Sequence, residues 1–265
     1  MKKFIAILVV LVLAFSLAAC GGDDKEGKLA SIDKAGKIVI YTDPNFPPFE
    51  YMGADGIEGV DIEIGKAIAE ELGVEVEFQD ANFDSIVMAI KGGKGDIAVS
   101  GMTITDDRKK SVDFSDPYIN SVQYLILPKG SDLTTVESLA GNNIGVAKGY
   151  TGSFLVDDEI NLPEGVLYES GSTFTEYPSA MEASLDLTNG KVACVVMDEY
   201  VAKNIASQYD ELEAIELKYE DGSNAAEEYG VVVAKGNEDL LEKINAVIKR
   251  LIDEGKIEEW IIKYA

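Results

Sequence analysis

Residues 37–80 read KIVIYTDPNFPPFEYMGADGIEGVDIEIGKAIAEELGVEVEFQD, and this stretch decides the fold class. Residues 38–42 form a short apolar run typical of a buried strand. Apolar residues then recur at helical spacing over residues 60–72, and Gly73 is expected to end that helix. Over residues 74–78 apolar side chains alternate with acids, which is the period of a strand. Strand, helix and strand in this order predict an α/β fold with parallel pairing.

The same alternation continues along the rest of the chain. Further strands are predicted at residues 97–100, 122–127, 143–147, 192–197 and 229–234. Further helices are predicted at residues 85–91, 177–189, 199–207, 238–254 and 256–264, with a short one before Gly141 that Thr134 and Glu137 begin as a capping box. Two runs of elements, with a shift near residues 120–130, predict two lobes, each a mainly parallel sheet flanked by helices.

The first twenty residues indicate an exported chain. Lys2 and Lys3 precede an uncharged apolar stretch, residues 4–19, which is too short for a membrane-spanning helix and typical of a secretory signal peptide. It ends Leu17-Ala18-Ala19-Cys20, which resembles the lipobox of bacterial lipoproteins. We therefore expect a lipoprotein signal peptide over residues 1–19, lipidation of Cys20 and a lipidated flexible tether over residues 20–36. A plain cleavage site with a chance cysteine is the alternative.

Composition excludes several classes of function. The chain has no histidine, which removes the commonest acid–base catalyst and the commonest transition-metal ligand, and we expect no metal and no cofactor. Its net charge of −25 becomes −27 when Lys2 and Lys3 leave with the signal peptide, and so acidic a surface repels nucleic acid. Once Cys20 is lipidated, only Cys194 remains, so an intrachain disulfide is excluded. The apolar run around Cys194 indicates a buried side chain rather than a reactive thiol.

Ligands of open α/β sheets bind beyond the carboxyl ends of the strands, so the residues after each predicted strand are the candidates. The loop after residues 38–42 contains three prolines, which stiffen it around Phe46 and Phe49. Arg108, which follows the strand at 97–100, is one of only two arginines, and its planar guanidinium can bind a carboxylate through two hydrogen bonds.

Two further candidates follow strands in the second half of the chain. The turn at residues 149–152 can present backbone N–H groups at the start of a helix, and Asp198 follows the strand at 192–197. A cation, N–H groups, an anion and aromatic walls together suit the carboxylate and ammonium of a free α-amino acid. Each group also has a structural explanation. The rings could be core, Arg108 could pair on the surface with Asp106 or Asp113, the glycines could form only a turn, and Asp198 could cap the next helix.

At this point the chain resembles the polar amino-acid branch of the periplasmic-type solute-binding proteins of ABC importers, over roughly residues 37–265. The motifs that carry the resemblance are Thr42-Asp43-Pro44-Asn45-Phe46-Pro47-Pro48-Phe49-Glu50, Gly59-Val60-Asp61, Ser100-Gly101-Met102-Thr103-Ile104-Thr105 with Arg108, Asp113-Phe114-Ser115-Asp116-Pro117-Tyr118, and Tyr229-Gly230. The resemblance implies a two-lobed type II periplasmic-binding-protein fold with two crossovers. Lobe 1 would be discontinuous (residues 37–120 and 228–265), and lobe 2 would comprise residues 121–227.

The resemblance also implies roles for individual residues. Arg108 would bind the ligand carboxylate, and Asp198 would bind the ammonium. Phe46 and Phe83 would hold the side chain between them. The complete expected ligand-binding set is Asp43, Phe46, Glu50, Phe83, Ser100, Gly101, Met102, Thr103, Arg108, Tyr150, Thr151 and Asp198. Tyr150 departs from the Gly-Thr-Thr-Gly that is common in the family, and it could add a wall or a hydroxyl to the pocket or point outward.

The function implied is extracytoplasmic capture of a free L-amino acid (arginine, lysine, histidine or glutamine) and its delivery to the permease of an ABC importer. The carrier would be a monomer held to the cell membrane only by its lipid, on a Gram-positive surface rather than in a Gram-negative periplasm. The main alternative is an enzyme on the same fold, a cyclohexadienyl or arogenate dehydratase, for which Glu50 or Asp43 would be the general acid. Arg108 with Asp198 and the lipobox favour a binding protein without catalysis.

Overall fold

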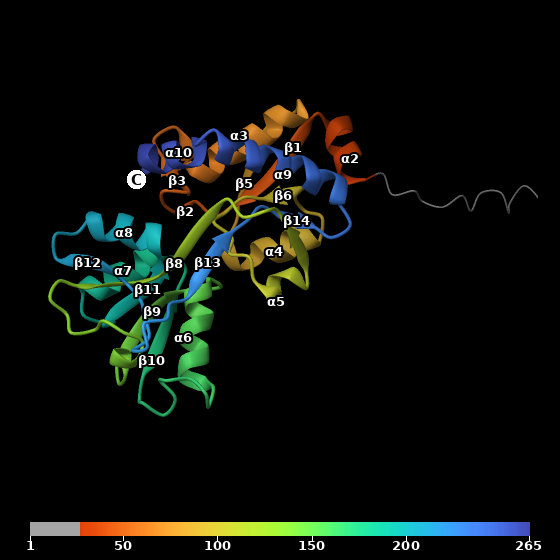
Figure 1. Cartoon of the computed structure of the whole chain (residues 1–265). Helices are drawn as coiled ribbons and strands as arrows, with labels where there is room; N and C mark the ends of the chain where they lie inside the picture. Colours follow the sequence, from red (N-terminus) through yellow and green to blue (C-terminus); the bar gives the residue numbers. More distant parts are fainter. Residues whose placement is uncertain (1–26) are drawn as a thin grey trace, which may run out of the picture.

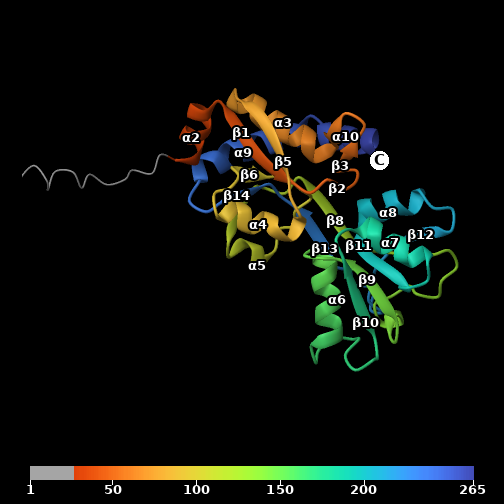
Figure 2. The same cartoon turned by 180° about the vertical axis from the view of Figure 1, so that it is seen from behind.

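The computed structural model describes residues 27–265, which form two lobes joined by two strands (Figures 1 and 2). Lobe 1 contains α2 (Lys28–Ala35), β1 (Lys37–Thr42), β2 (Asn45–Phe46), β3 (Glu50–Gly53), β4 (Gly56–Glu58), α3 (Val60–Leu72), β5 (Glu75–Asp80), α4 (Phe83–Lys91), β6 (Ile97–Ala98), α5 (Asp106–Lys109), β7 (Val112–Phe114), β14 (Val232–Ala234), α9 (Glu238–Asp253) and α10 (Lys256–Tyr264). Lobe 2 contains η1 (Glu137–Leu139), β9 (Asn143–Ala147), α6 (Thr151–Asn161), β10 (Thr173–Tyr177), α7 (Ala180–Thr188), β11 (Cys194–Asp198), α8 (Glu199–Ser207) and β12 (Leu212–Glu216).

The two connecting strands are β8 (Ile119–Pro128) and β13 (Ala226–Tyr229), which pair antiparallel with each other. The chain leaves lobe 1 along β8 and returns along β13, as Figure 1 shows. The two expected crossovers therefore lie side by side, and the lobe boundaries predicted at 120/121 and 227/228 fall within these strands.

Each lobe is built on a mixed sheet in which one strand runs against the others, so most strands share one direction, as predicted. The order in lobe 1 is β5-β1-β6-β14-β7, where β1 pairs parallel with β5 and β6 but β14 pairs antiparallel with β6 and β7. In lobe 2 the order is β10-β9-β11-β8-β12, and β8 is the antiparallel member. The reversed strands are β8, the outgoing crossover, and β14, which follows the returning one. Each of these two strands enters its sheet at the end where the strands of the βα units finish, so it runs antiparallel to them.

Local sequence explains the element that leads to the first binding loop. In β1 the side chains of Ile38, Ile40 and Thr42 are buried on alternate positions. Gly59 precedes α3 with φ +134°, and a Cβ there would lie 2.1 Å from the carbonyl oxygen of Phe49, so only glycine fits. Gly73 ends α3 in the left-handed conformation, as predicted.

Several predicted segments differ from the structure, and the strand predicted at 229–234, for example, is interrupted at residues 230–231 between β13 and β14. The expected tether, residues 20–36, overlaps helix α2, which packs through the fully buried Ile32 and an ion pair of Lys28 with Asp96 at 3.1 Å. Residues 20–26, with Cys20 and the signal peptide, lie outside the described residues. The helix predicted at 177–189 begins only at Ala180, as α7, and Tyr177 is instead the last residue of strand β10, which was not predicted. Four of the five residues in Thr173–Tyr177 are β-branched or aromatic and favour the strand. The hydroxyl of Ser179 caps the helix by accepting from the Glu182 N–H.

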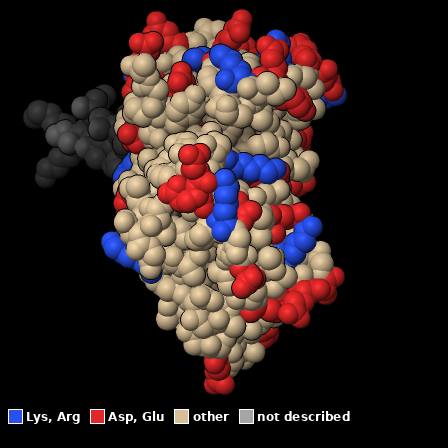
Figure 3. All heavy atoms as spheres, turned by 90° about the vertical axis from the view of Figure 1, so that its left-hand side faces the viewer, with Lys and Arg blue, Asp and Glu red and all other residues tan. Residues whose placement is uncertain are grey.

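The interior and the surface agree with the composition. Cys194 is fully buried in β11, and burial raises the pKa of its thiol to about 12, so it behaves as a small apolar residue. On the face shown in Figure 3, acidic side chains are scattered over both lobes and basic ones lie beside several of them. Such exposed pairs include Lys249 with Asp253 at 2.8 Å, and they add little to stability. Among residues 27–265, no helix is long and apolar enough to cross a membrane.

Candidate ligand-binding site

Arg108 points between the lobes rather than to the surface. It lies in the short helix α5, where the Thr105 hydroxyl accepts its backbone N–H at 3.2 Å. The guanidinium donates to the Thr103 carbonyl at 2.7 Å and, across the lobes, to the Gly149 carbonyl at 3.0 Å. The alternative of an ion pair with Asp106 or Asp113 is therefore wrong. Arg108 takes two carbonyls instead, and Asp113 pairs with Lys235 at 2.8 Å.

The charge of Arg108 is held in a partly desolvated place. Burial lowers the pKa of its guanidinium, and the negative charge of Asp198 acts in the opposite direction. Its carbon lies 5.3 Å from the centroid of the Phe83 ring, within the range of a cation–π contact. Carbonyl oxygens and an aromatic ring surround the guanidinium, and few other cations lie near it. It is therefore suited to bind a carboxylate.

Asp198 stands at the end of β11 and is buried, with 1% of its surface exposed. Its Oδ1 accepts from Gln123 Nε2 at 2.6 Å, and its Oδ2 accepts from the Tyr229 hydroxyl at 2.5 Å. Although Asp198 occupies the N-cap position of α8, its side chain accepts no capping hydrogen bond, so the simple capping alternative is wrong. The carboxylate faces the crossover strands β8 and β13, where a ligand ammonium would complete its set of donors.

Glu227 lies next to Asp198 and was missed by the sequence reasoning. It is 7% exposed on β13, and its Oε2 has no hydrogen-bond partner among the described residues. Burial, followed by the negative charge of Asp198, raises the pKa of the Glu227 carboxyl to about 9. At neutral pH Glu227 is therefore protonated, so Asp198 is the group of this pair that can carry the charge for an ammonium.

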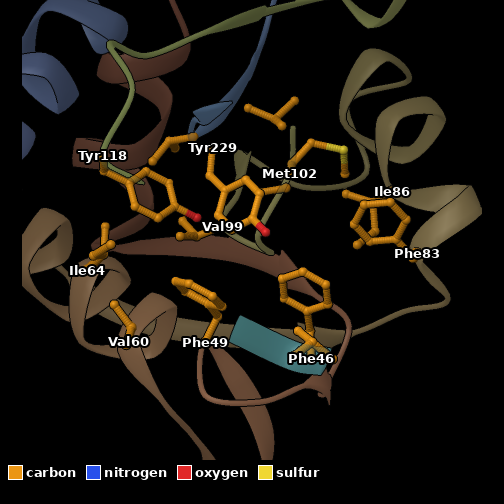
Figure 4. Close-up of a cluster of buried hydrophobic side chains, with 14 of the residues drawn as sticks. Phe46, Phe49, Val60, Ile64, Phe83, Ile86, Val99, Met102, Tyr118 and Tyr229 are labelled. Atoms are coloured by element: carbon orange, nitrogen blue, oxygen red, sulfur yellow. The ribbon is translucent and has the colours of Figure 1, made fainter. Parts of the chain in front are cut away.

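Three aromatic rings form the side-chain part of the site. Tyr150 stacks on Phe83 with centroids 3.8 Å apart at 13°, and on Phe46 with centroids 5.5 Å apart at 22°. Phe46 continues into the lobe 1 core through Phe49 and Tyr229, as Figure 4 shows. The ring of Tyr150 thus points inward, and the walls expected on either side of the ligand are Phe46 and Phe83.

The position of Phe46 depends on a glycine. Gly101 has φ +49°, and a Cβ there would lie 2.3 Å from the Phe46 ring. Its backbone N–H donates to Asp61 Oδ2 at 2.6 Å. The Ser-Gly-Met turn after β6 is therefore shaped to let the first wall lie flat against the backbone.

Asp43 lies at the inner end of the aromatic slot. Its Oδ2 accepts from the Phe83 N–H at 3.1 Å and from the Tyr150 hydroxyl at 3.3 Å, and its Oδ1 accepts from Asn45 Nδ2 at 2.6 Å. Burial raises the pKa of Asp43, while these hydrogen bonds lower it. Asp43 is placed where the far end of a ligand side chain would arrive.

Glu50 and Ser100 lie behind the site and do not face it. Both are fully buried, and the Ser100 hydroxyl donates to Glu50 Oε1 at 2.8 Å and accepts from the Asp43 N–H at 3.0 Å. Burial and the neighbouring charge of Asp61 raise the pKa of Glu50 well above its usual value, and burial raises the pKa of Asp61 to about 6. The expectation that Glu50 reaches the ligand is corrected, because its carboxyl is enclosed by this network and supports Asp43 through Ser100.

The remaining predicted residues surround Arg108. A groove of about 600 Å³ opens beside the guanidinium and is lined by Phe83, Met102, Arg108, Gly149, Thr151 and Phe154, among others. Thr151 begins α6, so its N–H belongs to the first turn, whose donors have no partner within the helix. Thr103 lies across from Tyr229 in an isolated bridge. The structure therefore brings Arg108, Thr103, Thr151, Asp198 and both walls to one place between the lobes.

Gln123 and Tyr229 are the other residues that the predicted set lacked. Gln123 lies in the apolar strand β8, and 1% of its surface is exposed. A polar side chain within such an apolar run needs a buried hydrogen-bond partner, so its presence in the sequence indicates a polar site nearby. Glu227 and Tyr229 alternate on the buried face of β13. Their shared face indicates that they lie together, but no pattern in the sequence shows that Asp198 faces them across the sheet.

The chain is similar to known proteins that bind amino acids. Residues 38–265 match the family described as bacterial extracellular solute-binding proteins, family 3. The chain belongs to this family. It is 31% identical, over all of its length and 96% of the relative, to a probable histidine-binding protein of Neisseria gonorrhoeae. It is 29% identical to the arginine-binding extracellular protein ArtP of Bacillus subtilis, over 98% of this chain and 96% of the relative.

A solved structure supports the same family and fold. The substrate-binding protein AbpA of Streptococcus pneumoniae, bound to L-arginine, is 34% identical, with a TM-score of 0.79 over 88% of this chain and 96% of that one. The predicted family and the type II two-lobed fold are thereby confirmed. Family membership also places the protein outside the cytoplasm.

Proposed function

We propose that this protein binds a free L-amino acid between its lobes and delivers it to an ABC importer. The observation that carries the proposal is that two opposite charges, the half-buried Arg108 and the buried Asp198, come from different lobes and face the same cleft. The carboxylate would bind Arg108 and the first-turn N–H of Thr151. The ammonium would bind Asp198, whose orientation is fixed by Gln123 and Tyr229.

The side chain we propose is polar or cationic: arginine, lysine, histidine or glutamine. A flat group in the place of the Tyr150 ring would lie between Phe46 and Phe83, and Asp43 at the end of the slot offers carboxylate oxygens to donors. The same features favour arginine within the set, because its guanidinium is planar, cationic and rich in N–H donors. The relatives named for arginine and histidine, and the arginine-bound structure, support this choice.

The contacts of Glu50 and Asp43 do not support the dehydratase alternative. The dehydratase alternative needs a general acid over a ring substrate, and Glu50, one candidate for it, is fully buried behind Ser100. Asp43 accepts three hydrogen bonds and is not exposed. We therefore propose a carrier without catalytic residues. We also propose that it acts as a monomer and that a lipid on Cys20 anchors it to the membrane at a Gram-positive cell surface. Replacement of Cys20 by serine should release the protein from the membrane fraction of an expressing cell.

The test of the proposed function is a calorimetric and thermal-shift screen of the twenty amino acids. A ligand at 100 times its dissociation constant should raise the free energy of unfolding by about 2.7 kcal/mol. Arg108→Lys keeps the charge but loses the planar pair of N–H donors, so it should weaken binding by about 10-fold or more, since a hydrogen bond to a charged group contributes about 1.5 kcal/mol or more. Asp198→Asn should weaken it similarly, since the ammonium would then meet a neutral amide.

The chain supplies a matched control. Arg250, the other arginine, lies on α9 and contacts Glu71 at 3.7 Å on the surface, so Arg250→Lys should leave binding unchanged. Citrulline, the neutral counterpart of arginine, should bind more weakly than arginine if Asp43 reads the charge. Binding by Arg108→Lys within a few-fold of the unaltered protein would contradict the carboxylate assignment, and a response to aspartate and glutamate alone would contradict the side-chain assignment.

A further inference from the structure

The slot between the two aromatic walls is filled by a residue of the protein itself. The Tyr150 ring lies 3.8 Å from Phe83, centroid to centroid, and nearly parallel to it, with Phe46 on its other side at 5.5 Å. Tyr150 is only 4% exposed. A second flat group between these walls would need about 3.5 Å or more on each of its faces. No ligand side chain can therefore enter the slot while the Tyr150 ring occupies it.

The polar end of Tyr150 also takes the place of a ligand group. Its hydroxyl donates to Asp43 Oδ2 at 3.3 Å, the carboxylate at the inner end of the slot. A planar body between Phe46 and Phe83, with a donor against Asp43, is the arrangement proposed above for the side chain of the amino acid. Tyr150 reproduces that arrangement from within the chain.

The residues beside Tyr150 reinforce the contact between the lobes. Gly149 offers its carbonyl to Arg108 at 3.0 Å, and a Cβ on Gly149 would lie 2.9 Å from the Asp84 Cβ. Lys148 pairs with Asp84 at 2.9 Å. Residues 148–150, which come from lobe 2, thus contact the start of α4 in lobe 1 at three successive positions. We call residues 148–150 the closing segment.

We propose that Tyr150 is an internal competitor of the ligand. Its ring holds the ligand-free lobes together and must leave the slot before an amino-acid side chain enters. This inference rests on the proposed function for the nature of the ligand. It makes Tyr150 a determinant of specificity, because side chains that gain little from two aromatic walls and Asp43, such as those of glycine and alanine, do not displace the ring. The apparent association constant for every ligand is the intrinsic constant multiplied by the fraction of molecules in which the ring is out of the slot.

The experiment compares Tyr150→Ala, Tyr150→Phe and the unaltered protein by calorimetry with arginine and by small-angle scattering without ligand. Tyr150→Ala is expected to bind arginine at least about fivefold more tightly and to have a larger ligand-free radius of gyration. Tyr150→Phe keeps the ring and loses only the contact with Asp43, so it should fall between the two. Tyr150→Thr is the second variant, in case alanine leaves lobe 2 poorly folded. Tyr168→Ala, at a position 42% exposed, is the control and should change neither quantity.

The outcomes separate this inference from the proposed function. Equal or weaker binding of arginine by Tyr150→Ala overturns the inference, since Tyr150 would then be a neutral residue or a wall of the ligand site. A radius of gyration that is the same in Tyr150→Ala and the unaltered ligand-free protein overturns the closing role. If no amino acid binds to any variant, the proposed function fails, and the scattering comparison still decides whether Tyr150 holds the lobes together.

Discussion

Replacing Glu227 by glutamine is expected to change how the stability of the ligand-free protein depends on pH. Glu227 is 7% exposed on β13 beside Asp198, and burial together with the Asp198 charge raises its pKa from 4.5 to about 9. In the unfolded chain the same carboxyl loses its proton near its ordinary value. Between these two values the folded protein holds one proton more than the unfolded chain.

The sign of the effect follows from that difference. A carboxyl with a raised pKa favours folding fully only below its unfolded pKa, and the free energy of unfolding falls as pH rises toward the folded value. The slope is about 1.4 kcal/mol per pH unit, so the contribution lost between pH 5 and pH 8 is at most about 4 kcal/mol. Glutamine keeps the neutral form at every pH and removes this slope.

The assay is urea unfolding of the ligand-free protein at intervals from pH 5 to pH 8. The difference in free energy of unfolding, Glu227→Gln minus the unaltered protein, should rise by about 2 to 4 kcal/mol over that range. Buried carboxyls elsewhere, such as Asp61 with its pKa raised to about 6, affect both proteins equally and cancel. Glu228→Gln removes a charge from an exposed position on the same strand and is the control.

An offset that adds to the expected rise equally at every pH would reflect a small change in packing and leaves the conclusion unchanged. Two curves that stay parallel from pH 5 to pH 8 would show that Glu227 is ionised in the folded protein. In that case the account of the ammonium site, with one charged and one neutral carboxyl, would be refuted.

Two further changes test the geometry of the cleft. Gly101→Ala should lower the free energy of unfolding by about 2 to 4 kcal/mol, because a Cβ there overlaps the Phe46 ring and adds backbone strain. Gly36→Ala, which also has a positive φ but nothing within 4 Å, should cost only about 1 kcal/mol in the same urea titration; equal losses would contradict the packing argument. Lys148→Met should change stability by less than about 1 kcal/mol, since its ion pair with Asp84 is largely exposed, and a larger loss would show that this pair, rather than Tyr150, dominates the closing segment.

Most of the fold could be predicted from local patterns. Helix α9 and the strand β1 have strong periodicity and clear ends, and the structure has them within a residue or so of the predicted bounds. Strand β10 was not predicted because Thr173–Tyr177 carries both polar residues and strand formers, and its pairing with β9 decides the outcome. The antiparallel direction of β8 and β14 depends on which lobe the chain enters next, which no local pattern encodes.

For the candidate site, the sequence could identify residues but not the direction of their side chains. Arg108 and Asp198 could be singled out because they follow strands, and the structure turns both toward the cleft. The inward direction of Tyr150 and the burial of Glu50 depend on contacts with residues far away in the sequence, Phe83 and Ser100. A sequence shows that such residues are unusual, whereas their direction is decided only when the lobes and loops are packed.

The hydrogen bonds already present show how a ligand enters without dismantling the site. A carboxylate has about four acceptor positions, so Asp198 can keep Gln123 and Tyr229 while it accepts an ammonium. Arg108 has five donors, so it can keep the Thr103 carbonyl and turn its other edge from the Gly149 carbonyl to a ligand carboxylate. The charged groups are thus held ready by lobe 1 and the crossover strands, and only the closing segment stands in the ligand's place. At Arg108 the new bond replaces the internal one to the Gly149 carbonyl, so its net gain is modest, about 1.5 to 3 kcal/mol for a bond to a charged group. Selectivity among amino acids therefore falls mainly to the side chain that takes over the Tyr150 slot.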